Sequence, residues 1–137
     1  MRLGLEAGVE LHNLSSVQTA AAPIIQHRSD LQDESRVADI LRDLQPDALI
    51  HLAAAGVRAG GTSLRELIAV NVLGLQTLLE AAARLERAPQ IVIAGSWFEY
   101  AAQNHPIRED DPLAPSTPYG VSKAAAHMLT YAYADKL

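Results

Sequence analysis

Hydrophobic positions along the chain follow two different periods. Residues 48–55 (ALIHLAAA) and 90–96 (QIVIAGS) are continuous apolar runs, which predict strands buried on both faces of a sheet. Residues 33–44 and 64–85 instead place apolar side chains three and four positions apart, which predicts two amphipathic helices. The stripe of the longer helix comprises Leu64, Leu67, Ile68, Leu75, Leu78, Leu79, Ala82 and Leu85.

The N-terminal part of the chain continues this alternation. Residues 2–8 are interpreted as the end of a helix that Gly8 closes, and residues 9–14 and 23–27 as two short strands. Strands that alternate with helices predict an α/β fold with a doubly wound parallel sheet. The length of 137 residues is that of a single domain.

Composition narrows the classes of partner and site. Hydrophobic residues make up 49% of the chain, and its formal net charge is −5. An acidic chain argues against nucleic acid or an anionic membrane as a partner. There is no cysteine, and the five histidines lack the spacing of a metal site, so no metal is expected. No signal peptide or apolar run of membrane-spanning length is recognised, and a cytoplasmic location is expected.

Polar and small residues follow the predicted strands, where open parallel sheets bind ligands. These stretches are residues 15–16, 51–56 and 95–96. Asn71 is a second signal, because it lies on the apolar stripe of the long helix. A buried amide without partners costs about 1–3 kcal/mol, so Asn71 is expected to have partners, in the simplest case a nearby loop carbonyl.

A tyrosine and a lysine lie four residues apart at the start of the last predicted helix. A loop rich in proline and aspartate covers residues 101–117, and Thr117 and Pro118 are interpreted as the cap and first turn of that helix. Tyr119 and Lys123 therefore share one helix face. An ammonium about 5 Å from a phenol favours the phenolate by about 3 kcal/mol at an effective dielectric constant of about 20. The pair suits acid/base chemistry, and the alternative is a surface tyrosine stacked on a lysine stem.

Taken in order, six segments resemble the extended short-chain dehydrogenase/reductases, the NAD-dependent epimerase/dehydratase family that acts largely on nucleotide sugars. The resemblance covers nearly the whole chain and rests on the order and spacing of the segments. They are GVELHNLSS, HRSDLQD, PDALIHLAAAGV, VNVLGLQTLLEAA, IVIAGSWFEY and REDDPLAPSTPYGVSKAAA. The implied fold is a partial NAD(P)-binding Rossmann domain over residues 1–137, truncated at both ends.

The resemblance also implies roles for individual residues. Tyr119 would exchange a proton with the substrate oxygen, Ser96 would polarise that oxygen, and Lys123 would bind the nicotinamide ribose. The cofactor would be NAD or NADP and the substrate a nucleotide sugar, with a homo-oligomer as a possible assembly. Cofactor contacts are expected from Asp30, Leu31, Leu52, Ala53, Ala54, Asn71, Tyr119 and Lys123.

The chain departs from the family pattern in several places. It has no G-x-x-G-x-x-G turn, and the strand before that turn is central in such sheets, so a gap between strands is expected. Most of the substrate region after the Tyr–Lys pair is also missing. Trp97 and Phe98 replace the Asp-Glu of the 4,6-dehydratases, which argues against dehydration; they would line a substrate pocket or pack in the core. Ser15 and Ser16 leave the choice between NAD and NADP open.

Three hypotheses about function follow. In the first, the chain is a segment of an epimerase or ketoreductase and is inactive, or nearly so, alone. In the second, it is an active enzyme that has replaced the phosphate loop or completes its site by pairing with another chain. In the third, it is a non-catalytic scaffold or interaction module on a degenerate Rossmann core. The presence of Ser96, Tyr119 and Lys123 favours the first two over the third, and the missing first strand favours the first over the second.

Overall fold

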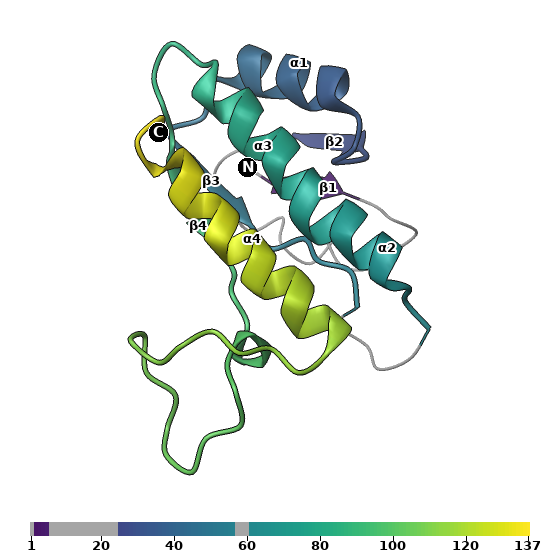
Figure 1. The fold of residues 1–137 in the computed structure, drawn as a ribbon. Helices are drawn as coiled ribbons and strands as arrows, with labels where there is room; N and C mark the ends of the chain where they lie inside the picture. Colours follow the sequence, from purple (N-terminus) through teal and green to yellow (C-terminus); the bar gives the residue numbers. More distant parts are fainter. Residues whose placement is uncertain (1, 6–24, 57–60) are drawn as a thin grey trace, which may run out of the picture.

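The computed structural model describes residues 2–5, 25–56 and 61–137, in which strands and helices alternate. Figure 1 shows α3 and α4 side by side over β3 and β4, and the α/β class is confirmed. In chain order the elements are β1 (Arg2–Leu5), β2 (Gln26–Ser29), α1 (Glu34–Leu44), β3 (Ala48–His51), α2 (Leu64–Ile68), the π-helical turn η2 (Ala69–Leu73), α3 (Gly74–Ala83), β4 (Gln90–Ile93), the 3-10 turn η3 (Trp97–Glu99) and α4 (Pro118–Ala134).

The described strands form two separate parallel pairs, β1–β2 and β3–β4. In the second pair Leu49 lies opposite Ile91, and Ile50 lies opposite Val92. Among the described residues no strand joins the two pairs.

The N-terminal segment differs from its prediction. Arg2–Leu5 is a strand that pairs in parallel with Gln26–Ser29, so the interpretation of residues 2–8 as the end of a helix is wrong there. The pairing partner is more than twenty residues away, and such non-local pairing overrides local preference. The predicted strand at residues 9–14, together with Gly8, lies outside the described residues, as do Ser15 and Ser16.

Residues 64–83 form one continuous helix with a single π-helical turn in its middle. Ser63 caps its start by accepting a hydrogen bond from the Glu66 amide. Five positions of the predicted stripe are buried, Ile68 and Leu85 are half-buried, and Leu64 in the first turn is exposed; the buried ones are Leu67, Leu75, Leu78, Leu79 and Ala82. This helix is long and apolar enough to cross a membrane, with a mean hydropathy of 1.3 in its most apolar window. The sequence pattern had not indicated a helix of that kind. Half of the relevant window is buried against the rest of the protein, as in a core helix.

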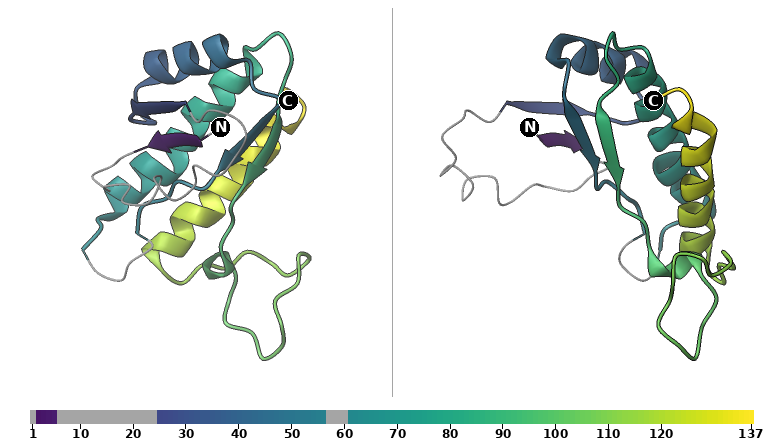
Figure 2. Two further views of the ribbon diagram at one scale, coloured as in Figure 1. Left: turned by 180° about the vertical axis from the view of Figure 1, so that it is seen from behind. Right: turned by 90° about the vertical axis from the view of Figure 1, so that its left-hand side faces the viewer.

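The core lies between the helices and one face of the β3–β4 sheet. Figure 2 shows α3 and α4 on the same side of these two strands, and α1 packs on α3. One cluster joins α1, β3 and α3, and a second joins α3 to α4. Their buried members are Leu31, Val37, Leu41, Leu49, Leu78, Ala81 and Ala82 in the first, and Leu75, Leu79, Ala126 and Tyr133 in the second.

The opposite face of β3 and β4 is exposed, which corrects the prediction of strands buried on both faces. Leu49 is 6% exposed, whereas its neighbour Ile50 is 67% exposed and Val92 is 59% exposed. Both strands are also shorter than predicted, because regular pairing ends at His51 and Ile93. Apolar composition alone predicted burial, but burial of a second face requires a covering element, and no described element covers it.

Self-association is expected from this exposed face. Ile50 and Val92 are cross-strand neighbours, so their side chains form one apolar patch on an open sheet. The chain should elute from size exclusion above its monomer mass of 14.7 kDa, and the double variant Ile50→Thr/Val92→Thr should elute later. Val121→Thr, an exposed position on α4, is the control. A sharp monomer peak from the unchanged chain would contradict this prediction.

Candidate active site

The turn after β4 packs against the first turn of α4. Ser96 follows β4 and caps η3, where its hydroxyl oxygen accepts a hydrogen bond from the Phe98 amide at 3.3 Å. The Phe98 ring meets the Tyr119 ring edge to face, with centroids 5.8 Å apart. A Cβ atom on Gly120 would overlap the Phe98 carbonyl oxygen, so only glycine permits this approach. The structure thus brings the Ser96 turn and the Tyr119 turn together.

Local capping sets the start of α4. The Thr117 hydroxyl oxygen accepts a hydrogen bond from the Gly120 amide at 3.0 Å, and Pro118 occupies the first turn, as predicted. Tyr119 is half-buried, and Lys123 follows one turn later. The predicted common face of Tyr119 and Lys123 therefore lies on a regular helix.

Lys123 holds a buried ammonium group at the carboxyl end of β4. Its side chain is 6% exposed, and Nζ donates a hydrogen bond of 2.6 Å to the carbonyl oxygen of Ala94. Burial lowers the pKa of Lys123, and the negative charge of Glu99 opposes that shift. An ammonium has three N–H donors, and among the described residues one of them is used, by the Ala94 carbonyl.

Asn71 lies in the π-helical turn and ties three segments together. Its Oδ1 accepts a hydrogen bond from the Ala55 amide at 2.7 Å, and its Nδ2 donates to the Ala55 carbonyl at 3.2 Å and to Ser122 Oγ at 2.9 Å. The Ser122 hydroxyl in turn donates to the Tyr119 carbonyl at 2.7 Å. The expected loop partner of this buried amide is confirmed. Both Nδ2 hydrogens already have partners within the protein. A contact between Asn71 and a cofactor stays a prediction.

The other predicted cofactor residues lie after β2 and β3. Asp30 is exposed, and its Oδ1 accepts the backbone amide two residues on at 2.9 Å. Leu31 is only 4% exposed and packs in the core. Leu52 is exposed, Ala53 packs on the core, and Ala54 is half-buried. These residues occupy the carboxyl ends of strands, as expected.

Comparison with known proteins identifies the family. A model of the NAD dependent epimerase/dehydratase family matches residues 1–137. The chain belongs to this family. The low-salt glycan biosynthesis protein Agl12 of Haloferax volcanii is 35% identical over 111 residues, which are 77% of this chain and 34% of that protein. A dTDP-glucose 4,6-dehydratase of Streptomyces antibioticus is 31% identical over 107 residues, which are 77% of this chain and 31% of that enzyme.

Solved structures of family members share the fold. The UDP-glucose 4-epimerase of Thermus thermophilus, in complex with NAD, has a TM-score of 0.71 and 28% identity over 83% of this chain and 38% of that one. The Rossmann-like architecture of this epimerase/dehydratase family chain is therefore confirmed. The chain spans about a third of the length of the curated relatives it matches.

The residues of this family member fit the two nucleoside ends of a dinucleotide. Within the described residues Lys123 Nζ bonds only the Ala94 carbonyl, so its other N–H groups could bind hydroxyl groups of a ribose. One carboxylate oxygen of Asp30 has no described partner, and it is exposed at the end of β2, where it could accept a hydrogen bond from an amine. The printed sequence has no G-x-x-G-x-x-G for the pyrophosphate between them.

His51 carries a buried imidazole near Lys123. It ends β3, its side chain is 6% exposed, and burial, with a smaller contribution from the Lys123 charge, lowers its pKa to about 4. At neutral pH it therefore adds no second positive charge beside Lys123. The sequence pattern placed His51 only at a strand end, and the reason for its low pKa is tertiary burial.

Protonation of His51 should destabilise the fold in acid. Its pKa is about 4 in the folded chain and about 6.5 when unfolded, so the unfolded state binds more protons between these values. The free energy of unfolding should fall by about 3 kcal/mol as the pH drops from about 6.5 to about 4. Urea denaturation of His51→Gln should lack this slope, and the exposed-site control His105→Gln should retain it. An unchanged slope in His51→Gln would contradict the assignment.

Sequence reasoning missed two residues beside the site, Glu99 and His127. Glu99 is 2% exposed although it lies in the short turn WFEY, and one of its carboxylate oxygens pairs with His127 Nδ1 at 2.8 Å. A signal was present: the four-residue spacing from Tyr119 to Lys123 continues to His127 and Tyr131. Glu99 itself carries no such signal, because its partner is 28 positions away.

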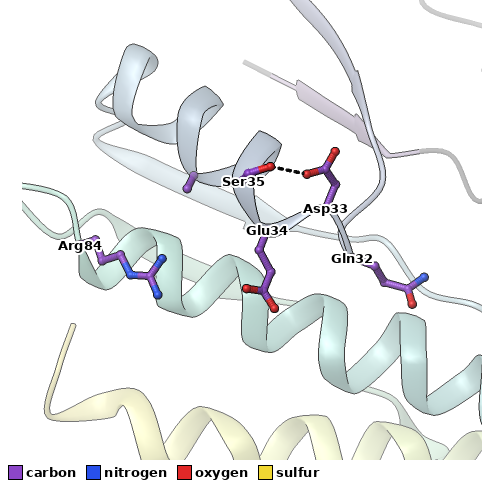
Figure 3. A pocket seen from close by; sticks show the side chains of 6 residues that line it. Gln32, Asp33, Glu34, Ser35 and Arg84 are labelled. Carbon is purple, nitrogen blue, oxygen red and sulfur yellow. Dashed lines mark hydrogen bonds between the residues drawn. The ribbon is translucent and has the colours of Figure 1, made fainter.

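A surface pocket lies elsewhere, between the start of α1 and the end of α3 (Figure 3). Within it, the Ser35 hydroxyl donates to Asp33 Oδ1 at 2.9 Å, a bond that belongs to the capping of α1. The pocket includes none of the predicted site residues. Its lining consists of Gln32, Asp33, Glu34, Ser35, Ala38 and Arg84.

Proposed function

We propose that this chain is the catalytic part of an NAD(P)-dependent epimerase or ketoreductase that acts on a nucleotide sugar through Ser96, Tyr119 and Lys123. The observation that carries the proposal is the contact between the Ser96 turn and the start of α4, next to the buried ammonium of Lys123. Family membership and the names of the relatives support the reaction class. A cytoplasmic location and a homo-oligomer are further parts of this proposal.

Each catalytic side chain has a distinct task in the proposed reaction. The Ser96 hydroxyl oxygen accepts a hydrogen bond from the Phe98 amide, so its own hydrogen is left to polarise a substrate oxygen. Tyr119 exchanges a proton with the same oxygen. Lys123, anchored on the Ala94 carbonyl, directs its remaining N–H groups to ribose hydroxyls and supplies positive charge near the phenol. A bound nicotinamide would supply the hydride acceptor or donor.

The residues after Ser96 favour epimerisation or ketoreduction over dehydration. Trp97 is 66% exposed and Phe98 is 37% exposed, and their rings lie 4.0 Å apart. Core packing therefore does not explain these two aromatic residues. A role in lining a substrate pocket beside Tyr119 explains them better. Neither residue can donate or accept the protons that the Asp-Glu pair of the 4,6-dehydratases would handle.

The experiment compares the chain with a completed enzyme, defined as this chain joined to the regions of a related UDP-glucose 4-epimerase that lie outside the match. The completed enzyme should bind NADH and turn over a UDP-sugar, and Ser96→Ala should abolish most turnover. The chain alone should show no saturable NADH or NADPH fluorescence change at micromolar concentration, because the pyrophosphate would lack its backbone cradle. Tight binding by the chain alone would contradict the segment hypothesis. Full turnover by Ser96→Ala would contradict the catalytic assignment.

A further inference from the structure

We propose that Glu99 and His127 are positioning residues for this site: a buried carboxylate and a half-buried imidazole whose pairing fixes the Ser96 turn to the helix carrying Tyr119 and Lys123. The inference rests on the proposed function and names two further residues that the reaction needs. Neither residue touches the reacting atoms, so both act through Ser96 and α4.

Glu99 uses both carboxylate oxygens inside the protein. Oε1 accepts a hydrogen bond from the Ser96 amide at 2.6 Å, and Oε2 pairs with His127 Nδ1 at 2.8 Å. The carboxylate is 2% exposed, and a buried carboxylate is costly unless it is paired and hydrogen-bonded. An ideal Cβ on Gly95 would lie 3.3 Å from Oε1, so a small residue before Ser96 leaves room for the group.

The Glu99 carboxylate thereby controls the orientation of Ser96. It holds the Ser96 amide from one side while the Ser96 hydroxyl oxygen accepts from the Phe98 amide, and together these bonds form a capping box. The backbone and the hydroxyl oxygen of Ser96 are both fixed, so its hydrogen has one outward direction left. Removing Glu99 would free the turn and leave the serine hydroxyl in several orientations.

His127 connects this turn to α4. It lies one turn after Lys123 and two turns after Tyr119, on the same helix face. Its Nε2 pairs with the Tyr131 hydroxyl at 3.2 Å, and the two rings stack with centroids 5.4 Å apart. Tyr131 therefore holds the Nε2 edge of the imidazole, and the Nδ1 atom that pairs with Glu99 belongs to a ring of fixed orientation.

Glu99 also serves as the counter-charge of Lys123. The ammonium is buried and bonded to the neutral Ala94 carbonyl, and the nearby carboxylate opposes the loss of its proton. One side chain thus influences all three proposed catalytic residues: Ser96 by a direct bond, Lys123 by charge, and Tyr119 through the helix.

Glu99→Gln and His127→Phe in the completed enzyme provide the test. Both variants should reduce kcat by about 10²-fold while KM for the UDP-sugar changes little. The reason is that a displaced Ser96 loses a hydrogen bond that stabilises the transition state and contributes little to substrate binding. His127→Asn retains a donor near the position of Nδ1 and should recover most of kcat. Glu109→Gln and His105→Phe, in the exposed loop before α4, are the matched controls.

Hydrogen exchange measured by mass spectrometry on the full 137-residue chain gives a second readout. Amides of residues 94–101 should exchange faster in Glu99→Gln and His127→Phe but not in the two controls. The proposal is overturned if Glu99→Gln and His127→Phe keep full kcat while Ser96→Ala loses it. If Ser96→Ala also keeps full kcat, the proposed function itself fails. Should Glu99→Gln not fold, the contrast between His127→Phe and His127→Asn decides.

Discussion

Tyr119→Phe should lower the turnover of the completed enzyme by about 10²–10⁴-fold, the usual contribution of a positioned acid/base group. The phenol lies beside the Ser96 turn, since its ring packs on Phe98 within η3. Removing one oxygen leaves this ring contact intact. Binding of NADH and the free energy of unfolding should therefore change little.

Tyr133→Phe is the matched control for this variant. It removes a tyrosine hydroxyl from the same helix, but that hydroxyl bonds Glu80 at 3.0 Å on α3, away from Ser96. Turnover of Tyr133→Phe should equal that of the unchanged enzyme. Equal turnover of Tyr119→Phe and Tyr133→Phe would favour the non-catalytic scaffold.

Gly120→Ala should both destabilise the chain and disturb the site. The new methyl group would overlap the Phe98 carbonyl oxygen and lie 3.1 Å from Thr117 Oγ1. Backbone atoms yield less easily than flexible side chains, so η3 and α4 must separate, at a cost of about 1–3 kcal/mol. Urea denaturation of the chain measures this loss, and turnover of the completed enzyme should fall because Ser96 and Tyr119 move apart.

The neighbouring substitution Val121→Ala separates this effect from helix propensity. Val121 is 43% exposed, so its truncation should change the free energy of unfolding by less than about 0.5 kcal/mol. If Gly120→Ala behaves like Val121→Ala, the close approach of η3 to α4 is not required for stability.

Local signals made several helix boundaries predictable. Asp33 caps α1 by accepting the Arg36 amide at 3.0 Å, and Thr117 with Pro118 starts α4 where the sequence indicates. Caps act within three or four residues, so they are visible in sequence. The interior of the long helix was predicted for the same reason, but its π-helical turn was not, because the pattern of apolar positions barely changes there.

Non-local contacts account for the wrong predictions. Arg2–Leu5 forms a strand through pairing with β2, and an isolated stretch of four residues does not reveal its partner. Ile50 and Val92 are exposed although they are strongly apolar, because burial depends on what covers a sheet face. The Tyr119–Lys123 pair is local and was found, whereas Glu99 acquires its meaning only when the fold brings His127 beside it.

The central claim is that Ser96 and Tyr119 act on one substrate oxygen, and a double-mutant cycle tests it most directly. Turnover of the completed enzyme is measured for Ser96→Ala, Tyr119→Phe and the double variant. Residues that act as a unit are non-additive, so the double variant should lose little more than the worse single variant. Losses that multiply independently, or no loss in either single variant, would contradict the claim.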